Sequence, residues 1–266
     1  MKLVAFDVDG TLVGRDLTIS QRVRDAVAQM RAAGITGCLV TGRMYRATLP
    51  FARELHLDAP LICYQGAAII DPATDEVLEH VALGNDIVRD LIGIAERDRM
   101  QLQLYRNDEY YCEARNRFSD LYASLSMTEP VIVPSLREVF WQSPATKAVI
   151  VADAPDAERY AEMLLQRFAG RAYVTRSLPE FVEVLDPAVD KGAALRFVAA
   201  RLAVAMEDTF AIGDSWNDAP LLAAAGFAIA MGSAPPELRA IADACVADVA
   251  HDGVAEALET YVLGTA

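Results

Sequence analysis

The chain is 266 residues long, 53% hydrophobic and 23% charged, which is typical of a globular protein with a sizeable core and excludes global disorder. Its formal net charge is −14 and its Lys and Arg residues are scattered rather than clustered, so we expect no nucleic-acid partner. No stretch has the roughly 18 uncharged apolar residues of a membrane span, and no apolar signal core precedes Asp7. We therefore expect a cytoplasmic protein with no membrane partner; the sequence indicates no particular oligomeric state.

Strands and helices alternate in the first third of the chain. An apolar run over residues 3–8 ends in acidic residues and Gly10, which predicts a buried strand followed by a loop. Ser20 is a plausible cap for the helix after that loop, and Pro50 must start or kink one turn of the next helix. The predicted order is strand, helix, strand, helix, strand, over residues 3–8, 20–33, 37–41, 45–56 and 61–64. This order is typical of a Rossmann-like, doubly wound α/β sheet.

The middle of the chain mixes helices with hairpins, and the last third returns to the first pattern. In the middle we expect helices at 86–99 and 157–168, and strands at 101–105, 110–113, 146–152, 172–175 and 181–185. In the last third we expect helices at 190–202, 219–225 and 253–263, and strands at 209–213 and 227–230. The sequence therefore predicts a core that is built from both ends of the chain, residues 1–83 plus 188–266, with an α+β lid inserted at 84–187.

Two carboxylates, Asp7 and Asp9, stand at the carboxyl end of the first predicted strand, with Gly10 and Thr11 directly after them. At that end of a strand the chain can turn and bring both acids toward the crevice where α/β folds bind ligands. Gly10 permits a tight turn. The structural alternative is a strand end that is capped by turn-forming residues.

Two further motifs carry groups that suit a phosphate. Thr41, Gly42 and Arg43 end the second strand, where a hydroxyl and free backbone N–H groups can hold an anion. Lys191 lies in the first turn of a predicted helix and opposes the helix dipole there, which suggests that its amine meets an anion. Taken alone, Thr41 could be an ordinary strand-end residue, and Lys191 an exposed lysine beside an aspartate.

A second pair of acids, Asp214 and Asp218, follows the predicted strand at 209–213, with Asn217 between them. Carboxylate oxygens gathered on loops suit a hard cation such as Mg²⁺. The alternative is a helix cap at Asp214 with a favourable first-turn acid at Asp218.

In this combination and order the chain resembles the haloacid dehalogenase-like hydrolases, and within them the Cof-type phosphatases with an α/β cap. All four family motifs are present: Asp7-Val8-Asp9-Gly10-Thr11, Thr41-Gly42-Arg43, Lys191-Gly192, and Gly213-Asp214 with Asn217-Asp218. Two further stretches match the Cof pattern, Gln65-Gly66-Ala67 and Ala230-Met231-Gly232. The resemblance spans nearly the whole chain, although the cap matches only in length and position.

The resemblance implies a Mg²⁺-dependent phosphatase acting on a small phosphate ester, most simply a sugar phosphate. Asp7 would be the nucleophile that forms an aspartyl-phosphate, and Asp9 would be the acid that protonates the leaving alcohol and then the base that activates water. The resemblance also implies phosphoryl binding by Thr41, Gly42 and Lys191, with Asn217 as a substrate-binding residue that contacts the phosphate or orients Lys191. Metal binding is implied for Asp7, Asp214 and the backbone carbonyl of Asp9, and support for Asp218, Gly10, Thr11 and Arg43. The inserted cap at 84–187 would select the substrate.

Two stretches depart from the family pattern: Gln65 stands where Asn is usual, and Val249-Ala250-His251 replaces an Asn-rich segment. In the cap, a polar and aromatic cluster could face a sugar or could pack on a sheet. It comprises Tyr105, Arg106, Asn107, Tyr110 and Tyr111, while Arg43, Tyr45 and Arg46 lie nearer the phosphate end.

Three other functions remain open. A phosphomutase or a pathway-specific sugar-phosphate phosphatase could use the same core. A non-enzymatic phospho-acceptor module would also place carboxylates, Thr and Lys at strand ends, but it would lack Asp9-Gly10-Thr11 and a lid of this length. Dehalogenase chemistry would not use two acidic pairs.

Overall fold

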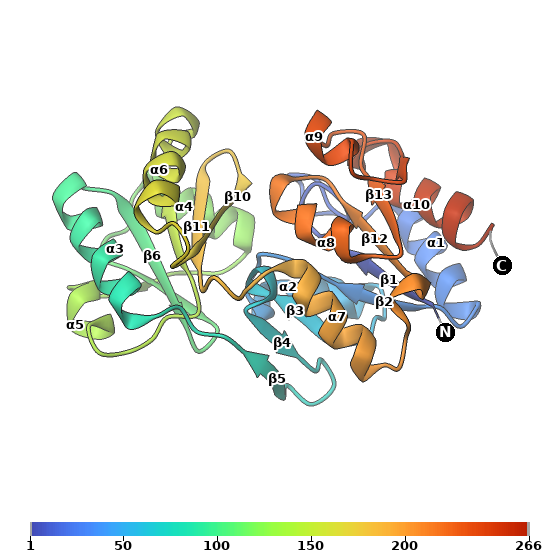
Figure 1. The fold of residues 1–266 in the computed structure, drawn as a ribbon, viewed down its shortest axis with the longest axis horizontal. Helices are drawn as coiled ribbons and strands as arrows, with labels where there is room; N and C mark the ends of the chain where they lie inside the picture. The colour runs from blue at the N-terminus through green and yellow to red at the C-terminus, as the bar shows by residue number, and fades with distance from the viewer. Residues whose placement is uncertain (1, 265–266) are drawn as a thin grey trace. The chain divides into compact units, whose positions relative to one another are not determined.

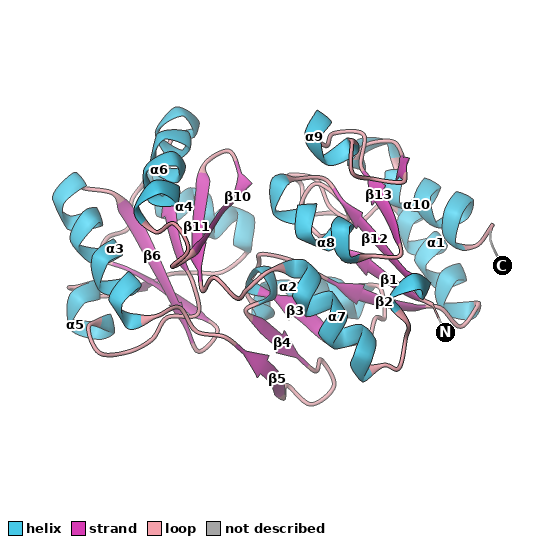
Figure 2. Ribbon diagram, in the orientation of Figure 1, coloured by secondary structure: helices cyan, strands magenta, loops and turns pink. Residues whose placement is uncertain are grey.

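The computed structural model describes residues 2–264, which form two compact units (Figure 1). The core unit comprises Met1–Leu78 and Asp190–Ala266, and the inserted unit comprises Glu79–Val189. Helices and strands mix in both units, and the core unit holds a parallel sheet, so the predicted α/β class is confirmed (Figure 2). Among the residues described, no helix is both long enough and apolar enough to cross a membrane.

The core unit is built on a parallel sheet in the order β14-β13-β12-β1-β2. Its strands are β1 (Leu3–Phe6), β2 (Thr36–Leu39), β12 (Thr209–Gly213), β13 (Phe227–Ala230) and β14 (Ala244–Cys245). Central β1 pairs with β12 on one side and β2 on the other, so that Phe6 lies opposite Ile212 and Leu39. Every residue of β1 and β12 is buried, which explains why both strands are unbroken apolar runs.

Helices cover both faces of this sheet, as in a doubly wound fold. They are α1 (Gln21–Ala32), α2 (Tyr45–Glu54), α7 (Lys191–Arg201), α8 (Ala219–Ala224), α9 (Pro236–Arg239) and α10 (Gly253–Ala257). On one face, Leu195 of α7 and Leu221 of α8 share an apolar cluster with Ala5. On the other face, the side chains of Met30 of α1 and Phe6 both adjoin Gly37 of β2. The predicted cap of α1 is confirmed, because Ser20 Oγ accepts the Val23 N–H at 3.2 Å.

The third predicted strand does not extend the parallel sheet. β3 (Leu61–Cys63) pairs antiparallel with β4 (Ala68–Ile70), and β5 (Val77–His80) completes a separate three-stranded sheet. One isolated parallel bridge, Val40 to Ile62, links β3 to the line of β2. The sequence did not predict β4 or β5, and β5 is largely exposed, so it lacks the apolar alternation of a half-buried strand.

The inserted unit contains a six-stranded sheet in the order β10-β11-β9-β6-β7-β8. Its strands are β6 (Gln101–Arg106), β7 (Glu109–Cys112), β8 (Val131–Ile132), β9 (Ala148–Val151), β10 (Tyr173–Leu178) and β11 (Phe181–Leu185). Its helices are α3 (Asn85–Asp98), α4 (Arg117–Ser126), α5 (Leu136–Phe140) and α6 (Ala154–Arg167). The predicted antiparallel hairpin is confirmed as β6 and β7, whereas α4 and α5 were not predicted.

Alternate residues of this sheet face two different environments. Leu104, Ile150 and Val184 join the apolar cluster that packs against helices. Tyr105 lies on the opposite face, fully buried, with its ring 5.8 Å from that of Tyr110. Tyr105 and Tyr110 are therefore packing residues of the inserted unit, the second of the two roles that the sequence left open.

A buried ion pair also lies on that second face, between Lys147 and Glu183. The Lys147 ammonium is 2.8 Å from Glu183 Oε2, both side chains are at most 3% exposed, and the ammonium lies 4.9 Å from the centre of the Tyr105 ring. Removing one partner leaves a buried charge, so we expect Lys147→Met to destabilise the protein by about 3–5 kcal/mol. The double change Lys147→Met with Glu183→Leu should recover most of that loss, and urea denaturation of the three proteins checks this. A double variant as unstable as the single one would contradict it.

Candidate functional site

The predicted motifs of the core unit meet at one edge of the parallel sheet. Asp7 directly follows β1, and its N–H donates to the carbonyl of Ile212 at 3.0 Å. Thr41 lies two residues after the end of β2, and its N–H donates to the carbonyl of Ile62 at 2.9 Å. Asp214 directly follows β12. Because the carboxyl ends of parallel strands lie together, residues that are far apart in sequence become neighbours here.

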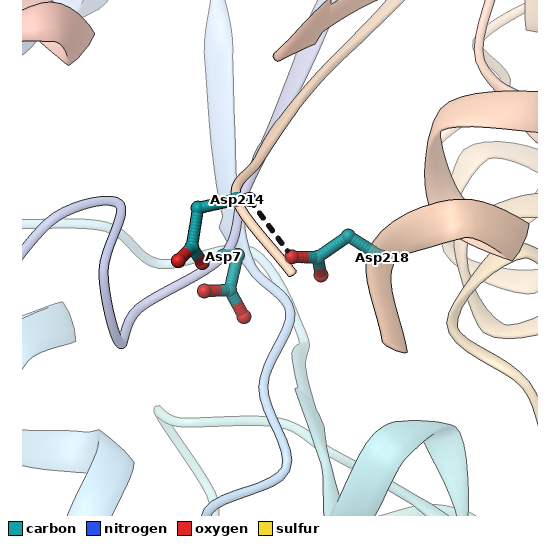
Figure 3. A group of neighbouring side chains, drawn as sticks. All are labelled: Asp7, Asp214 and Asp218. Atoms are coloured by element: carbon teal, nitrogen blue, oxygen red, sulfur yellow. Dashed lines mark hydrogen bonds between the residues drawn. The ribbon is translucent and has the colours of Figure 1, made fainter. Parts of the chain in front are cut away.

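Three acidic side chains converge at this edge (Figure 3). Asp7, Asp214 and Asp218 each offer a carboxylate oxygen, and these oxygens lie within 4.8 Å of one another. Asp7 and Asp218 are buried, and Asp214 is partly buried. Such a group of oxygens could hold a metal ion.

Lys191, the first residue of α7, lies among these acids. Its ammonium is 2.6 Å from Asp7 Oδ1 and 2.6 Å from Asp218 Oδ1, and the side chain is fully buried. Burial alone would lower the pKa of Lys191, but the charges of Asp218 and Asp7 raise it overall, so the amine stays protonated. Its position at the start of α7 is stabilised by Asp190, whose side chain accepts the Ala193 N–H at 2.6 Å.

The charges in this group do not balance. Ionised, the carboxylates of Asp7, Asp214 and Asp218 face the single ammonium of Lys191. Burial and the neighbouring charge of Asp218 raise the pKa of Asp7 well above its usual value. The same two causes, in the same order, raise the pKa of Asp214 to about 7. A divalent cation would supply the two positive charges that the group lacks.

Asp218 shapes the loop that carries Asp214. Its Oδ2 accepts the backbone N–H of Asp214 at 3.0 Å (Figure 3) and that of Ser215 at 3.1 Å, while its Oδ1 accepts from Lys191. Both oxygens of Asp218 are therefore engaged in positioning its neighbours. This geometry suits the supporting role that the family resemblance implies for Asp218.

The side chain of Asp9 lies outside the acidic group. Arg43 donates two hydrogen bonds to this carboxylate, from Nε to Asp9 Oδ2 at 2.7 Å and from Nη2 to Asp9 Oδ1 at 2.6 Å. The Arg43 N–H in turn donates to Thr41 Oγ1 at 3.1 Å. The sequence marked Arg43 only as a supporting residue, because nothing in the spacing of two motifs 34 residues apart shows that they form an ion pair. Metal binding by the Asp9 carbonyl stays a prediction.

Gly10 brings the first motif close to the loop after β12. Its φ is +85°, and a Cβ at this position would lie 2.2 Å from Asp214 Oδ2. Thr11 reaches the same carboxylate, with its hydroxyl 3.5 Å from Asp214 Oδ1.

We expect Gly10→Ala to displace the carboxylate of Asp214 and to add backbone strain of about 1–2 kcal/mol. Gly34→Ala is the matched control, because Gly34 also has a positive φ, +76°, but has nothing within 4 Å of a built Cβ. Thermal unfolding with and without a divalent cation should show that only Gly10→Ala loses cation-dependent stabilisation. If both variants lost the same amount of cation-dependent stabilisation, backbone strain would explain the loss and the contact with Asp214 would not.

Two buried amides complete the site, and the sequence had not linked them. Asn217 Nδ2 donates to Gln65 Oε1 at 3.1 Å, across 152 positions of the chain. In the sequence Gln65 stands out only as a departure from the family pattern. Gln65 lies two residues after the end of β3, and the sequence predicted this strand to end at the same edge of the sheet. That position was the only sequence feature from which this contact could have been predicted.

The sequence is similar to a known protein family and to several characterised proteins. The sequence matches the family described as haloacid dehalogenase-like hydrolase over residues 4–258. It is 28% identical over 271 residues to 5-amino-6-(5-phospho-D-ribitylamino)uracil phosphatase YitU of Bacillus subtilis, which covers 97% of each chain. It is 28% identical over 239 residues to HMP-PP phosphatase of Escherichia coli O6:H1, covering 90% of this chain and 87% of the relative.

The structure has similar counterparts among solved proteins. A haloacid dehalogenase-like hydrolase from Bacteroides thetaiotaomicron matches it with a TM-score of 0.86 and 28% identity, over 97% of this chain and 98% of the other. The similarity therefore extends through both units and is not confined to the motifs.

Proposed function

Because the chain belongs to the haloacid dehalogenase-like hydrolases and is an enzyme of the phosphatase type, we propose that it is a Mg²⁺-dependent phosphomonoesterase. Its substrates are small phosphorylated metabolites, most simply sugar phosphates, and the reaction passes through an aspartyl-phosphate on Asp7. The observation that carries this proposal is the buried Asp7 carboxylate at a strand end, held by Lys191 at 2.6 Å beside Asp214 and Asp218. Packing does not explain why three carboxylates and a lysine ammonium gather at one point.

The acidic group suits the metal. Asp7 and Asp214 would be its side-chain ligands, together with the carbonyl of Asp9, and Asp218 would position Asp214. Bound there, Mg²⁺ would neutralise charge on the transferring phosphoryl group and reduce its repulsion from the nucleophile. The excess of negative charge among these side chains favours a dication over a monovalent ion.

In the first step a carboxylate oxygen of Asp7 attacks phosphorus, and the ester P–O bond breaks. Lys191 orients the nucleophile through its bond to Oδ1 and stabilises negative charge as it develops on the phosphoryl oxygens. Asp9 gives a proton to the leaving alkoxide, so the products of this step are an alcohol and the aspartyl-phosphate.

In the second step Asp9 accepts a proton from water, and the oxygen of that water attacks phosphorus. The bond to Asp7 breaks, and inorganic phosphate leaves. Arg43 engages both carboxylate oxygens of Asp9. For both proton transfers Asp9 must therefore release Arg43 and form a hydrogen bond with the reacting oxygen instead. Thr41, Gly42 and Asn217 are the remaining residues that we assign to binding the phosphoryl group.

A panel of phosphomonoesters, ranked by kcat/KM for phosphate release, tests this proposal. A ribityl phosphate belongs in the panel, because YitU is named for such a substrate. Release of phosphate to water supports a phosphatase, whereas return of the phosphoryl group to a second position of the same sugar would identify a phosphomutase. Phosphorylation of Asp7 without turnover would identify a phospho-acceptor module. We assign substrate selection to residues 84–187.

A further inference from the structure

The turn Tyr64–Gly66, directly after β3, has an unusual backbone. Three successive residues have positive φ: 53° at Tyr64, 62° at Gln65 and 104° at Gly66. Only glycine adopts such angles without strain, and strained residues persist where the surroundings hold them in place. One such restraint is the hydrogen bond from the Tyr64 N–H to the carbonyl of Arg43, at 2.9 Å.

The same turn is tied to two other loops of the site. The Gln65 N–H donates to the carbonyl of Thr41 at 2.9 Å. Gly66 packs so closely on the residue before Lys191 that a Cβ there would lie 2.7 Å from the carbonyl oxygen of Asp190. The turn therefore contacts the chain beside both of the proposed phosphoryl-binding side chains, Thr41 and Lys191.

The side chain of Gln65 reaches a third loop. Its Oε1 accepts from Asn217 Nδ2 at 3.1 Å, and the two residues are 0% and 5% exposed. The other polar atom of that amide, Asn217 Oδ1, is buried and has no hydrogen-bond partner among residues 2–264. A buried amide atom without a partner costs free energy, which indicates that the Asn217 amide changes its partners when a ligand binds.

An amide can present either end to a ligand, because oxygen and nitrogen exchange places when the group rotates by half a turn. Phosphoryl oxygens accept hydrogen bonds, so Asn217 must turn Nδ2 toward them to bind. Its Oδ1 then faces Gln65, which can donate from its own Nε2 after the same rotation. A glutamine at position 65 can therefore keep its hydrogen bond to Asn217 in both orientations of the Asn217 amide. A side chain that can only accept a hydrogen bond, or that is too short to reach Asn217, cannot do so.

We propose that Gln65 is a positioning residue for the phosphoryl group, acting through Asn217. The strained turn places its backbone against Thr41. Once both amides have rotated, the Nε2 of Gln65 holds Oδ1 of Asn217 and leaves Asn217 Nδ2 to the phosphoryl oxygens. This inference rests on the proposed phosphatase function.

Gln65→Met tests the role, because it keeps the length of the side chain but removes its amide. We expect KM for a phosphomonoester, and the inhibition constant of inorganic phosphate, to rise by roughly 10-fold, the effect of one hydrogen bond to a charged group. In an Asn217→Ala background the same change should have no further effect on either constant. Gln103→Met, which removes a buried amide of the inserted unit, should leave phosphate inhibition unchanged.

Gln65→Asn separates positioning from folding. Asparagine tolerates a positive φ better than glutamine but is one methylene shorter, so this variant should be at least as thermostable as the wild type and still bind phosphate more weakly. Stabilisation by inorganic phosphate with Mg²⁺, read from thermal unfolding, measures that binding without turnover.

The outcomes separate this inference from the proposed function. Full additivity of Gln65→Met and Asn217→Ala would overturn the inference, because Gln65 would then not act through Asn217. So would wild-type phosphate affinity in both Gln65 variants of an active phosphatase. A wild type that neither hydrolyses phosphomonoesters nor is stabilised by inorganic phosphate would overturn the proposed function and this inference with it.

Discussion

Asp7→Asn is expected to lower phosphatase activity by at least about 1,000-fold, because the amide is a poor nucleophile and cannot form the acyl phosphate. The fold should survive. Asparagine has the same shape as aspartate, and the change removes one of three crowded carboxylates, although Lys191 then keeps only Asp218 as its acidic partner. Hydrolysis of p-nitrophenyl phosphate, together with thermal unfolding, measures both effects.

The control for this variant is Asp16→Asn, the same chemical change at an exposed aspartate of the loop after the first motif. It should leave turnover unchanged. If Asp7→Asn still turned over p-nitrophenyl phosphate at a rate comparable to that of the wild type, Asp7 would not be the nucleophile. A variant that lost both activity and its unfolding transition would instead show that Asp7 is required for folding.

EDTA is expected to abolish the activity, and Mg²⁺ to restore it, because Asp7, the proposed nucleophile, lies in a group with more negative than positive charge. The same cation should stabilise the folded protein, since unfolding disperses the carboxylates that bind it. At a concentration 100 times its dissociation constant, a ligand that binds only the folded state contributes about 2.7 kcal/mol. Thermal unfolding in EDTA and in Mg²⁺ measures this effect without any substrate.

Asp214→Asn provides the specific control for metal binding. It should lose most of the stabilisation by Mg²⁺, whereas Asp25→Asn, at an exposed aspartate of α1, should keep it. Full activity in the presence of chelator would refute the proposed role of the metal. Equal stabilisation of both variants by Mg²⁺ would place the cation elsewhere on this acidic protein.

Most elements of the core could be predicted from the sequence because they are buried. β1 and β12 are mainly apolar runs. The N-cap of α1 and the apolar residues of its buried face can both be recognised in the sequence. α4 was not predicted, although Asn116 and Ser119 form a capping box at its start. Two of its buried positions are Ser119 and Ser126, so its inward face does not show as an apolar repeat.

The turn after β3 shows why strand order is harder to predict than strand position. The apolar run at 61–64 correctly predicts a strand, but the partner of that strand in a sheet depends on the turn at its end. The positive φ angles of Tyr64–Gly66 fold the chain back, so β3 pairs with β4 rather than lying fully within the parallel sheet. Glutamine and tyrosine rarely adopt such angles, so the local sequence alone does not predict this reversal.

By itself the sequence determined which residues are candidates for the chemistry and at which strand ends they stand, because turn-forming acids after apolar runs are a local pattern. Only the tertiary structure decided which charges meet. Lys191 lies against Asp7 across 184 positions of the chain, and Arg43, not the acidic group, holds Asp9. Ion pairs of this kind depend on distances of a few ångströms between separate loops, and the order of residues along one chain does not contain those distances.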